Sequence, residues 1–142
     1  MSKLVVDASV AIKWYVPEVY SKESIKLLSP AFELYVPDLL FSEIGNILWK
    51  HRMKGELSRE KSQTIIAAIS TVLFSVATSH SLMLNALNIA CKYHRTFYDS
   101  VYIALAEKQN CRFVTADLKL YNALKNGPLK KYILWVEDIP NA

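Results

Sequence analysis

The chain has 142 residues, of which 52% are apolar, and its 17 lysines and arginines outnumber its 13 aspartates and glutamates to give a formal charge of +4. We expect one domain over residues 1–142, with a core that needs no disulfides. The sequence has no apolar run long enough for a membrane span, no recognisable signal peptide, and two cysteines without disulfide or metal-site spacing. These exclusions favour a cytoplasmic protein that does not enter a membrane.

Short apolar runs alternate with amphipathic segments along the chain. The spacing of apolar residues in each segment, together with its turn and capping residues, predicts the helices and strands. In chain order they are a strand ending at Val6, a helix over 18–28, a strand over 34–36, a helix over 38–52 capped by Asp38, a helix over 58–71, a strand over 74–77, helices over 81–93 and 97–109, a strand over 112–115, a helix over 117–125 and a strand over 132–136.

This alternation predicts an α/β fold with a short parallel sheet covered by helices on both faces. In such sheets, ligands bind beyond the carboxyl ends of the strands. Asp7 directly follows the first strand, and Asp117 follows the strand over 112–115. Two carboxylates are therefore expected at the edge where binding sites form. Each also has a purely structural interpretation as the N-cap of the next helix.

Two further acids belong to helices. Asp99 lies three residues after Thr96, in the spacing of a capping box, so a structural role explains it well on its own. Glu43 is harder to explain, because it lies at the edge of the apolar face of its helix, with no lysine or arginine three or four residues away. A carboxylate in that position favours a functional role.

Four carboxylates in one pocket would repel one another unless cations bind there. Ligands that are all oxygen atoms favour a hard ion such as Mg²⁺ or Mn²⁺. Such a site can orient a phosphodiester and help to deprotonate water. With four acids withdrawn into a pocket, the rest of the surface would be strongly basic, which suits a polyanionic substrate.

Four segments carry a family resemblance, and they occur in the same order as in that family. They are VVDASVAIKWYV, PDLLFSEIGNIL, FYDSVYIALAE and FVTAD. Together they resemble PIN-domain ribonucleases, and the short chain is similar to the VapC-type toxins of prokaryotic toxin–antitoxin pairs. The resemblance covers essentially the whole chain.

The resemblance implies a three-layer α/β/α sandwich in which Asp7, Glu43, Asp99 and Asp117 form the acidic quartet that binds Mg²⁺ or Mn²⁺. Ser9 and Thr115 correspond to hydroxyl positions beside these acids. Asn46, one turn after Glu43, faces either the site or solvent. No acid of the quartet is missing. The family also implies a homodimer and an antitoxin that covers the site.

The expected function is a metal-dependent endoribonuclease acting as the toxin of such a pair. Two alternatives remain open. One is a PIN nuclease outside a toxin pair that processes RNA or acts on DNA. The other is a module that binds RNA without cleaving it, which the intact quartet argues against.

Overall fold

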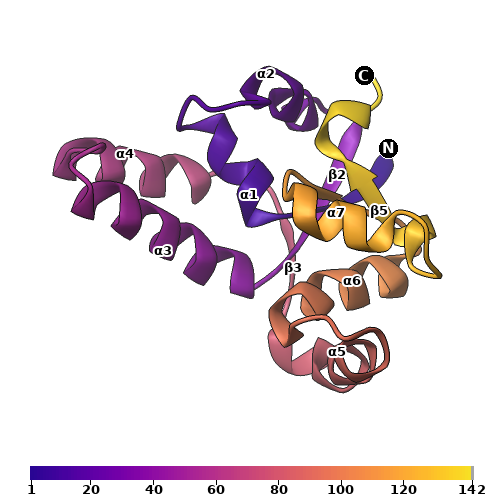
Figure 1. Ribbon diagram of the computed structural model, residues 1–142. Helices are drawn as coiled ribbons and strands as arrows, with labels where there is room; N and C mark the ends of the chain where they lie inside the picture. Colours follow the sequence, from indigo (N-terminus) through magenta and orange to yellow (C-terminus); the bar gives the residue numbers. More distant parts are fainter. Residues whose placement is uncertain (142) are drawn as a thin grey trace.

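The computed structural model describes residues 1–141 and has a central parallel sheet with helices on both faces (Figure 1). The strand order is β3-β2-β1-β4-β5, and every neighbouring pair is parallel. The strands are β1 (Ser2–Val6), β2 (Phe32–Pro37), β3 (Ser75–Ala77), β4 (Arg112–Thr115) and β5 (Ile133–Trp135). The predicted α/β/α sandwich is therefore confirmed.

The helices fall into two layers. The α-helices are α1 (Ala8–Ala11), α2 (Ser21–Ser24), α3 (Leu39–Met53), α4 (Arg59–Ile69), α5 (Ser79–Tyr93), α6 (Phe97–Gln109) and α7 (Leu118–Leu124). Four 3-10 segments are η1 (Ile12–Trp14), η2 (Ile25–Leu28), η3 (Lys130–Tyr132) and η4 (Val136–Asp138). No helix in the described part of the chain is both long enough and apolar enough to cross a bilayer.

Alternation along the strands divides the core between the two faces of the sheet. Leu4 and Val6 pack with the layer that contains α1, α3 and α4, whereas Val5 packs with α5, α6 and α7. Because successive side chains of a strand point to opposite faces, a run of three apolar residues supplies both cores at once. This explains why Leu4, Val5 and Val6, the buried end of the first strand, are all apolar up to Asp7.

Helix α6 is buried almost all round, with Val101 to Ala106 all inaccessible. It contacts β1, β2 and β4 on one side and packs extensively against α5 on the other. Thr96 begins α6, because its hydroxyl accepts the backbone N–H of Asp99 at 3.0 Å. The predicted bounds of 97–109 match the structure.

Two expectations about helix ends were wrong. The helix expected over 18–28 begins only at Ser21, because Tyr20 takes a left-handed conformation with a φ of 70°. Asp38 does not cap α3 with its side chain. Its Oδ1 instead accepts the backbone N–H of Ser79 at 3.0 Å, together with the hydroxyl of Ser79. Asp38 therefore ties the start of α3 to the start of α5.

Candidate active site

All four predicted acids line one pocket at the carboxyl edge of the sheet, with a cavity volume of about 520 Å³. Asp7 follows β1, Glu43 lies on α3, Asp99 lies in the first turn of α6, and Asp117 follows β4. The remaining lining side chains belong to Ala8, Ser9, Leu39, Ser42, Asn46, Ile47, Lys50 and Tyr98. Elements from both helical layers thus meet at the edge where the parallel strands end.

Asp7 occupies the N-cap position of α1, but its side chain makes no capping hydrogen bond. Its Oδ2 instead accepts the hydroxyls of Ser9 at 2.8 Å and Thr115 at 2.9 Å. Burial, with a smaller repulsion from Glu43, raises the pKa of Asp7 from 3.8 to about 6 despite these two donors. The helix-cap interpretation of this residue was wrong, and a partly buried carboxylate without a cationic partner remains.

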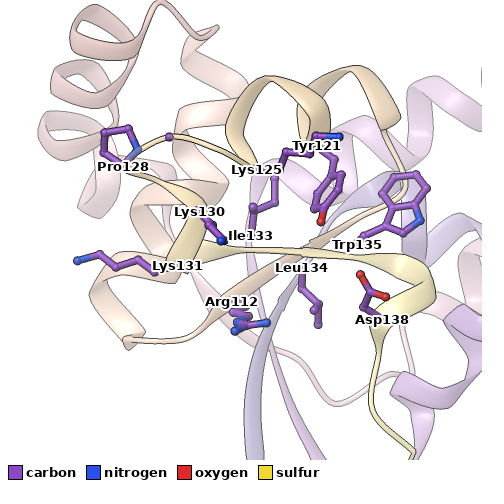
Figure 2. Close-up of a pocket in the computed structure, with 11 residues that line it drawn as sticks. Arg112, Tyr121, Lys125, Pro128, Lys130, Lys131, Ile133, Leu134, Trp135 and Asp138 are labelled. Atoms are coloured by element: carbon purple, nitrogen blue, oxygen red, sulfur yellow. The ribbon is translucent and has the colours of Figure 1, made fainter.

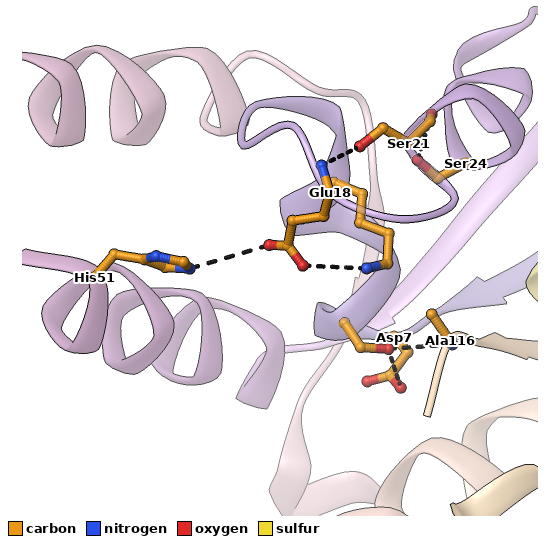
Figure 3. A network of polar contacts seen from close by, with 8 residues as sticks. Asp7, Glu18, Ser21, Ser24, His51 and Ala116 are labelled. Carbon is orange, nitrogen blue, oxygen red and sulfur yellow. Dashed lines mark hydrogen bonds and ion pairs between the residues drawn. The ribbon is translucent and has the colours of Figure 1, made fainter. Parts of the chain in front are cut away.

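Thr115 and Ser9 join the two strand ends that supply acids. Thr115 is fully buried, and its Oγ1 accepts the backbone N–H of Asp117 at 3.0 Å while donating to Asp7. The hydroxyl of Ser9 likewise accepts the backbone N–H of Ala116 at 3.2 Å (Figure 3). The two hydroxyls predicted beside the acids thus hold Asp7 and the residues after β4 in one network.

Asp117 fits both of its predicted interpretations at once. Its Oδ1 accepts the backbone N–H of Leu120 at 3.2 Å and so caps α7. The same side chain lines the acidic pocket. A capping role therefore does not remove a carboxylate from a site, because one oxygen satisfies the helix and the other accepts no hydrogen bond from residues 1–141.

Glu43 has a partner that the sequence analysis missed. The hydroxyl of Tyr102, on α6, donates to Glu43 Oε1 at 2.5 Å. Tyr102 itself is buried and stacks on Phe113 with ring centroids 5.1 Å apart. The sequence feature that could have indicated this contact is the position of Tyr102 one helical turn beyond Asp99, on a helix expected to reach the site.

Burial also raises the pKa values of Glu43 and Asp99. Neighbouring carboxylates raise them further, whereas the charge of Arg95 partly opposes the rise at Asp99. Asp7 feels the charge of Glu43, Glu43 feels that of Asp99, and Asp99 feels that of Asp117. The four carboxylates therefore lie close enough together in the pocket for their charges to repel one another. Within residues 1–141, none of the four lies within 4.0 Å of a cationic side chain.

The donor set fits a hard divalent cation. Three of the acids each have one oxygen held by the protein and a second, Asp7 Oδ1, Glu43 Oε2 and Asp117 Oδ2, that accepts no hydrogen bond within the described residues. No three histidine, cysteine, aspartate or glutamate side chains of residues 1–141 converge as a ready-made ligand cluster. Oxygen donors alone are the ligands that hard divalent cations prefer.

Asn46 and Lys50 extend the pocket along the exposed face of α3, one and two turns beyond Glu43. Asn46 is exposed and also lines the cavity, so it faces both the site and solvent. Lys50 is the cationic side chain of the lining.

Glu18 fixes the position of α3 relative to the segment that follows Asp7. Its carboxylate lies 3.2 Å from Lys13 Nζ, in η1, and 4.0 Å from His51 Nε2, on α3 (Figure 3). Its backbone N–H donates to the hydroxyl of Ser21 at 2.9 Å. Glu18 thus links η1 to α3, and solvent-accessible ion pairs of this kind contribute at most about 1 kcal/mol each.

Comparisons of the sequence identify relatives along most of the chain. The family model described as the PIN domain matches residues 4–125. Ribonuclease VapC3 of Pyrobaculum aerophilum is 36% identical over 121 residues, which cover 83% of this chain and 92% of that protein. Ribonuclease VapC1 of Mycobacterium tuberculosis is 27% identical over 120 residues, covering 84% of this chain and 90% of that protein.

Solved structures share the same fold. PAE2754 from Pyrobaculum aerophilum superposes with a TM-score of 0.67 at 24% identity, covering 96% of this chain and 85% of that chain. A toxin–antitoxin complex from Klebsiella pneumoniae gives 0.63 at 14% identity, covering 92% and 95%. VapBC2 from Rickettsia felis, bound to a promoter DNA fragment, gives 0.66 at 10% identity, covering 94% and 98%.

Proposed function

This chain belongs to the PIN-domain family, and from that membership and its acidic pocket we propose that it is a divalent-metal-dependent endoribonuclease of the VapC type. The observation that carries the proposal is the cluster of Asp7, Glu43, Asp99 and Asp117 in one pocket, where none of them forms a salt bridge within residues 1–141. The similarity to ribonucleases VapC3 and VapC1 supports RNA as the substrate class.

The carboxylates have distinct positions in the proposed site. Asp7 is held most firmly, because two hydroxyls fix one of its oxygens, and Glu43 is oriented by the phenol of Tyr102. Their raised pKa values mean that the ionised forms are unfavourable in the metal-free pocket, so a cation gains affinity by relieving this cost. When bound, Mg²⁺ or Mn²⁺ would polarise a phosphoryl oxygen and lower the pKa of water.

The chain's own groups then position the reactants. A carboxylate oxygen of the four acids that does not hold the ion would be available to accept a proton from the attacking water. Lys50, at the rim of the cavity, is placed to contact a phosphate next to the scissile one. The pocket would admit a flexible RNA strand, whose phosphodiester the acids alone would repel.

The proposal extends to the partners that the family implies, a cognate antitoxin and a second copy of this chain. Large apolar side chains that remain exposed support partner surfaces, among them Trp49 on α3 at 57% exposure and Leu84 on α5 at 72%. Light scattering of the purified protein tests the homodimer, and co-purification with the product of an adjacent small gene tests the antitoxin. Because the proposed substrate is cellular RNA, we place the protein in the cytoplasm.

The activity is tested by incubating the purified protein, freed of any co-purifying protein under denaturing conditions and refolded, with a mixed RNA pool. We expect cleavage with Mn²⁺ or Mg²⁺ and none with EDTA. Metal-dependent cutting of DNA in preference to RNA would favour a PIN nuclease outside a toxin pair. RNA binding without turnover under every metal condition would favour the non-catalytic binding module.

A further inference from the structure

The acidic pocket is one end of a chain of four adjoining concavities. The second cavity, of about 210 Å³, lies next to the acidic pocket and shares Asp99 and Asp117 with that pocket. A third, of about 130 Å³, shares Arg95 with the second. The fourth, of about 700 Å³, shares Gly127 and Pro128 with the third. Because they share lining residues, these concavities follow one another over the surface from the acids to strand β5, and we refer to this series as the path.

Cationic side chains line this path beyond the acids. They are Arg95 and Lys119 in the second cavity and Arg112, Lys125, Lys130 and Lys131 in the fourth. Asp138 is the single carboxylate that lines the fourth cavity, and no carboxylate of residues 1–141 lies within salt-bridge distance of any of the six cations. The positive charge of the path is therefore available to a ligand.

Figure 2 shows how the fourth cavity is built around β5, the edge strand of the sheet. Lys130, Lys131 and Arg112 lie near the start of this strand, whereas Trp135 and Asp138 lie at its other end. Trp135 is only 9% exposed and packs against Tyr121 with ring centroids 5.4 Å apart. The charged groups of the cavity are mainly ammonium and guanidinium groups, which contact phosphates rather than stack on bases.

Helix α7 connects the two ends of the path. Asp117 caps its start in the acidic pocket, and Lys125 follows its last turn in the fourth cavity. The rise between them is about 12 Å, which corresponds to roughly three to four nucleotides of a stacked strand at about 3.4 Å each. A strand whose scissile phosphate lies at the acids would therefore reach Lys125 within a few nucleotides.

We propose that this basic path, defined by Arg95, Lys119, Arg112, Lys125, Lys130 and Lys131, binds the backbone phosphates of a single-stranded RNA whose scissile bond lies in the acidic pocket. The inference rests on the proposed nuclease function. The two connecting cavities are small, which suits one sugar–phosphate chain rather than a duplex. An acidic peptide fits less well, because the path continues into four carboxylates that would repel it.

The test compares two triple variants with the same change in charge. The first is Lys125→Ala/Lys130→Ala/Lys131→Ala in the fourth cavity. The control is Lys26→Ala/Arg59→Ala/Lys61→Ala, whose residues line none of the four cavities. Binding of an unstructured, fluorescein-labelled RNA of about 12 nucleotides is measured in EDTA over a range of salt concentrations, so that no turnover is needed.

For the first variant we expect the Kd at low salt to rise roughly tenfold or more, and the slope of log K against log salt to become shallower by about 2, since each single-strand phosphate contact contributes about 0.7. The control should bind as the wild type does. Wild-type Kd and slope in the first variant would overturn the proposal, and weakened binding of a glutamate-rich peptide alone would instead assign the cavity to a protein partner.

The same samples separate this inference from the nuclease proposal. Loss of binding in the first variant supports the RNA path even if the wild type cleaves no RNA. Cleavage by the wild type, with unchanged RNA binding in the first variant, contradicts the path alone.

Discussion

The hydroxyl of Tyr102 donates to Glu43 Oε1 at 2.5 Å, joining two residues that are 59 positions apart in the chain. This hydrogen bond connects the two helical layers across the carboxyl edge of the sheet, since Glu43 lies on α3 and Tyr102 on α6. It also leaves Glu43 Oε2 facing no protein donor in the described residues. The fold thus holds a glutamate ready to bind a cation at little further conformational cost.

Tyr102→Phe is expected to lower RNA cleavage by roughly 10- to 100-fold, the usual cost of losing a group that orients a metal ligand. The ring stack on Phe113 remains, so the fold should survive. Tyr35→Phe is the matched control, because Tyr35 donates to Glu33 at 2.7 Å away from the pocket. Equal rates for the wild type and Tyr102→Phe, in single-turnover assays, would exclude an orienting role for this hydroxyl.

Asp7→Asn is expected to abolish cleavage while stabilising the metal-free protein. A pKa of about 6 in place of 3.8 means that ionised Asp7 destabilises the fold by about 3 kcal/mol above pH 6. An asparagine oxygen still accepts from Ser9 and Thr115, without the charge. Urea unfolding in EDTA at about pH 7.5 measures this difference.

The stability difference between Asp7→Asn and the wild type should depend on pH. Because burial raises the pKa of folded Asp7, its unfavourable contribution is present above about pH 6 and disappears as the pH falls toward 3.8. The gain in stability of Asp7→Asn over the wild type should therefore shrink between about pH 7.5 and about pH 4.5. Glu107→Gln, at an exposed position of α6, should show no such trend. A gain that grows on acidification would contradict the assignment.

Thr115→Val should destabilise the protein by about 1–3 kcal/mol, because the buried hydroxyl both donates to Asp7 and accepts the N–H of Asp117. Thr115→Ser keeps the hydroxyl and should recover most of the RNA cleavage that Thr115→Val loses. If valine and serine gave the same cleavage rate, Thr115 would be a packing residue only.

Divalent ions should stabilise the wild type by mass action, by about 2.7 kcal/mol when the free ion is at 100 times its Kd. Thermal unfolding with increasing Mn²⁺ measures this, and Asp7→Asn and Asp99→Asn should lose most of the effect. Glu107→Gln serves again as the control with the same loss of charge. A shift in Tm that persists in both aspartate variants would place the ion elsewhere.

Local signals in the sequence were sufficient wherever structure depends on nearby residues. Thr96 with Asp99 forms the N-terminal hydrogen bond that its spacing predicts. The strand ends that deliver Asp7 and Asp117 were also predictable, because parallel strands of an α/β sheet terminate at one edge. The single-domain interpretation of residues 1–142 stays a prediction.

Contacts between distant residues were not predictable from these signals. Asp38 was expected to cap α3, but Ser79, 41 residues away, supplies better donors. Tyr102 and Glu43 meet only because the sheet brings α3 and α6 to the same edge. The basic path likewise joins residues from four separate segments. The net charge of the sequence indicates a basic surface, but it does not show where on the surface the cations gather.

The central claim, that the four acids form the site of RNA cleavage, is tested most directly by single-turnover cleavage of one labelled RNA over a range of Mn²⁺ concentrations by the wild type, Glu43→Gln and Glu107→Gln. We expect Glu107→Gln to match the wild type. Glu43→Gln should lose more activity than the roughly 10- to 100-fold loss that is usual when a group that only orients a metal ligand is removed. Wild-type rates in Glu43→Gln at every Mn²⁺ concentration would contradict the account.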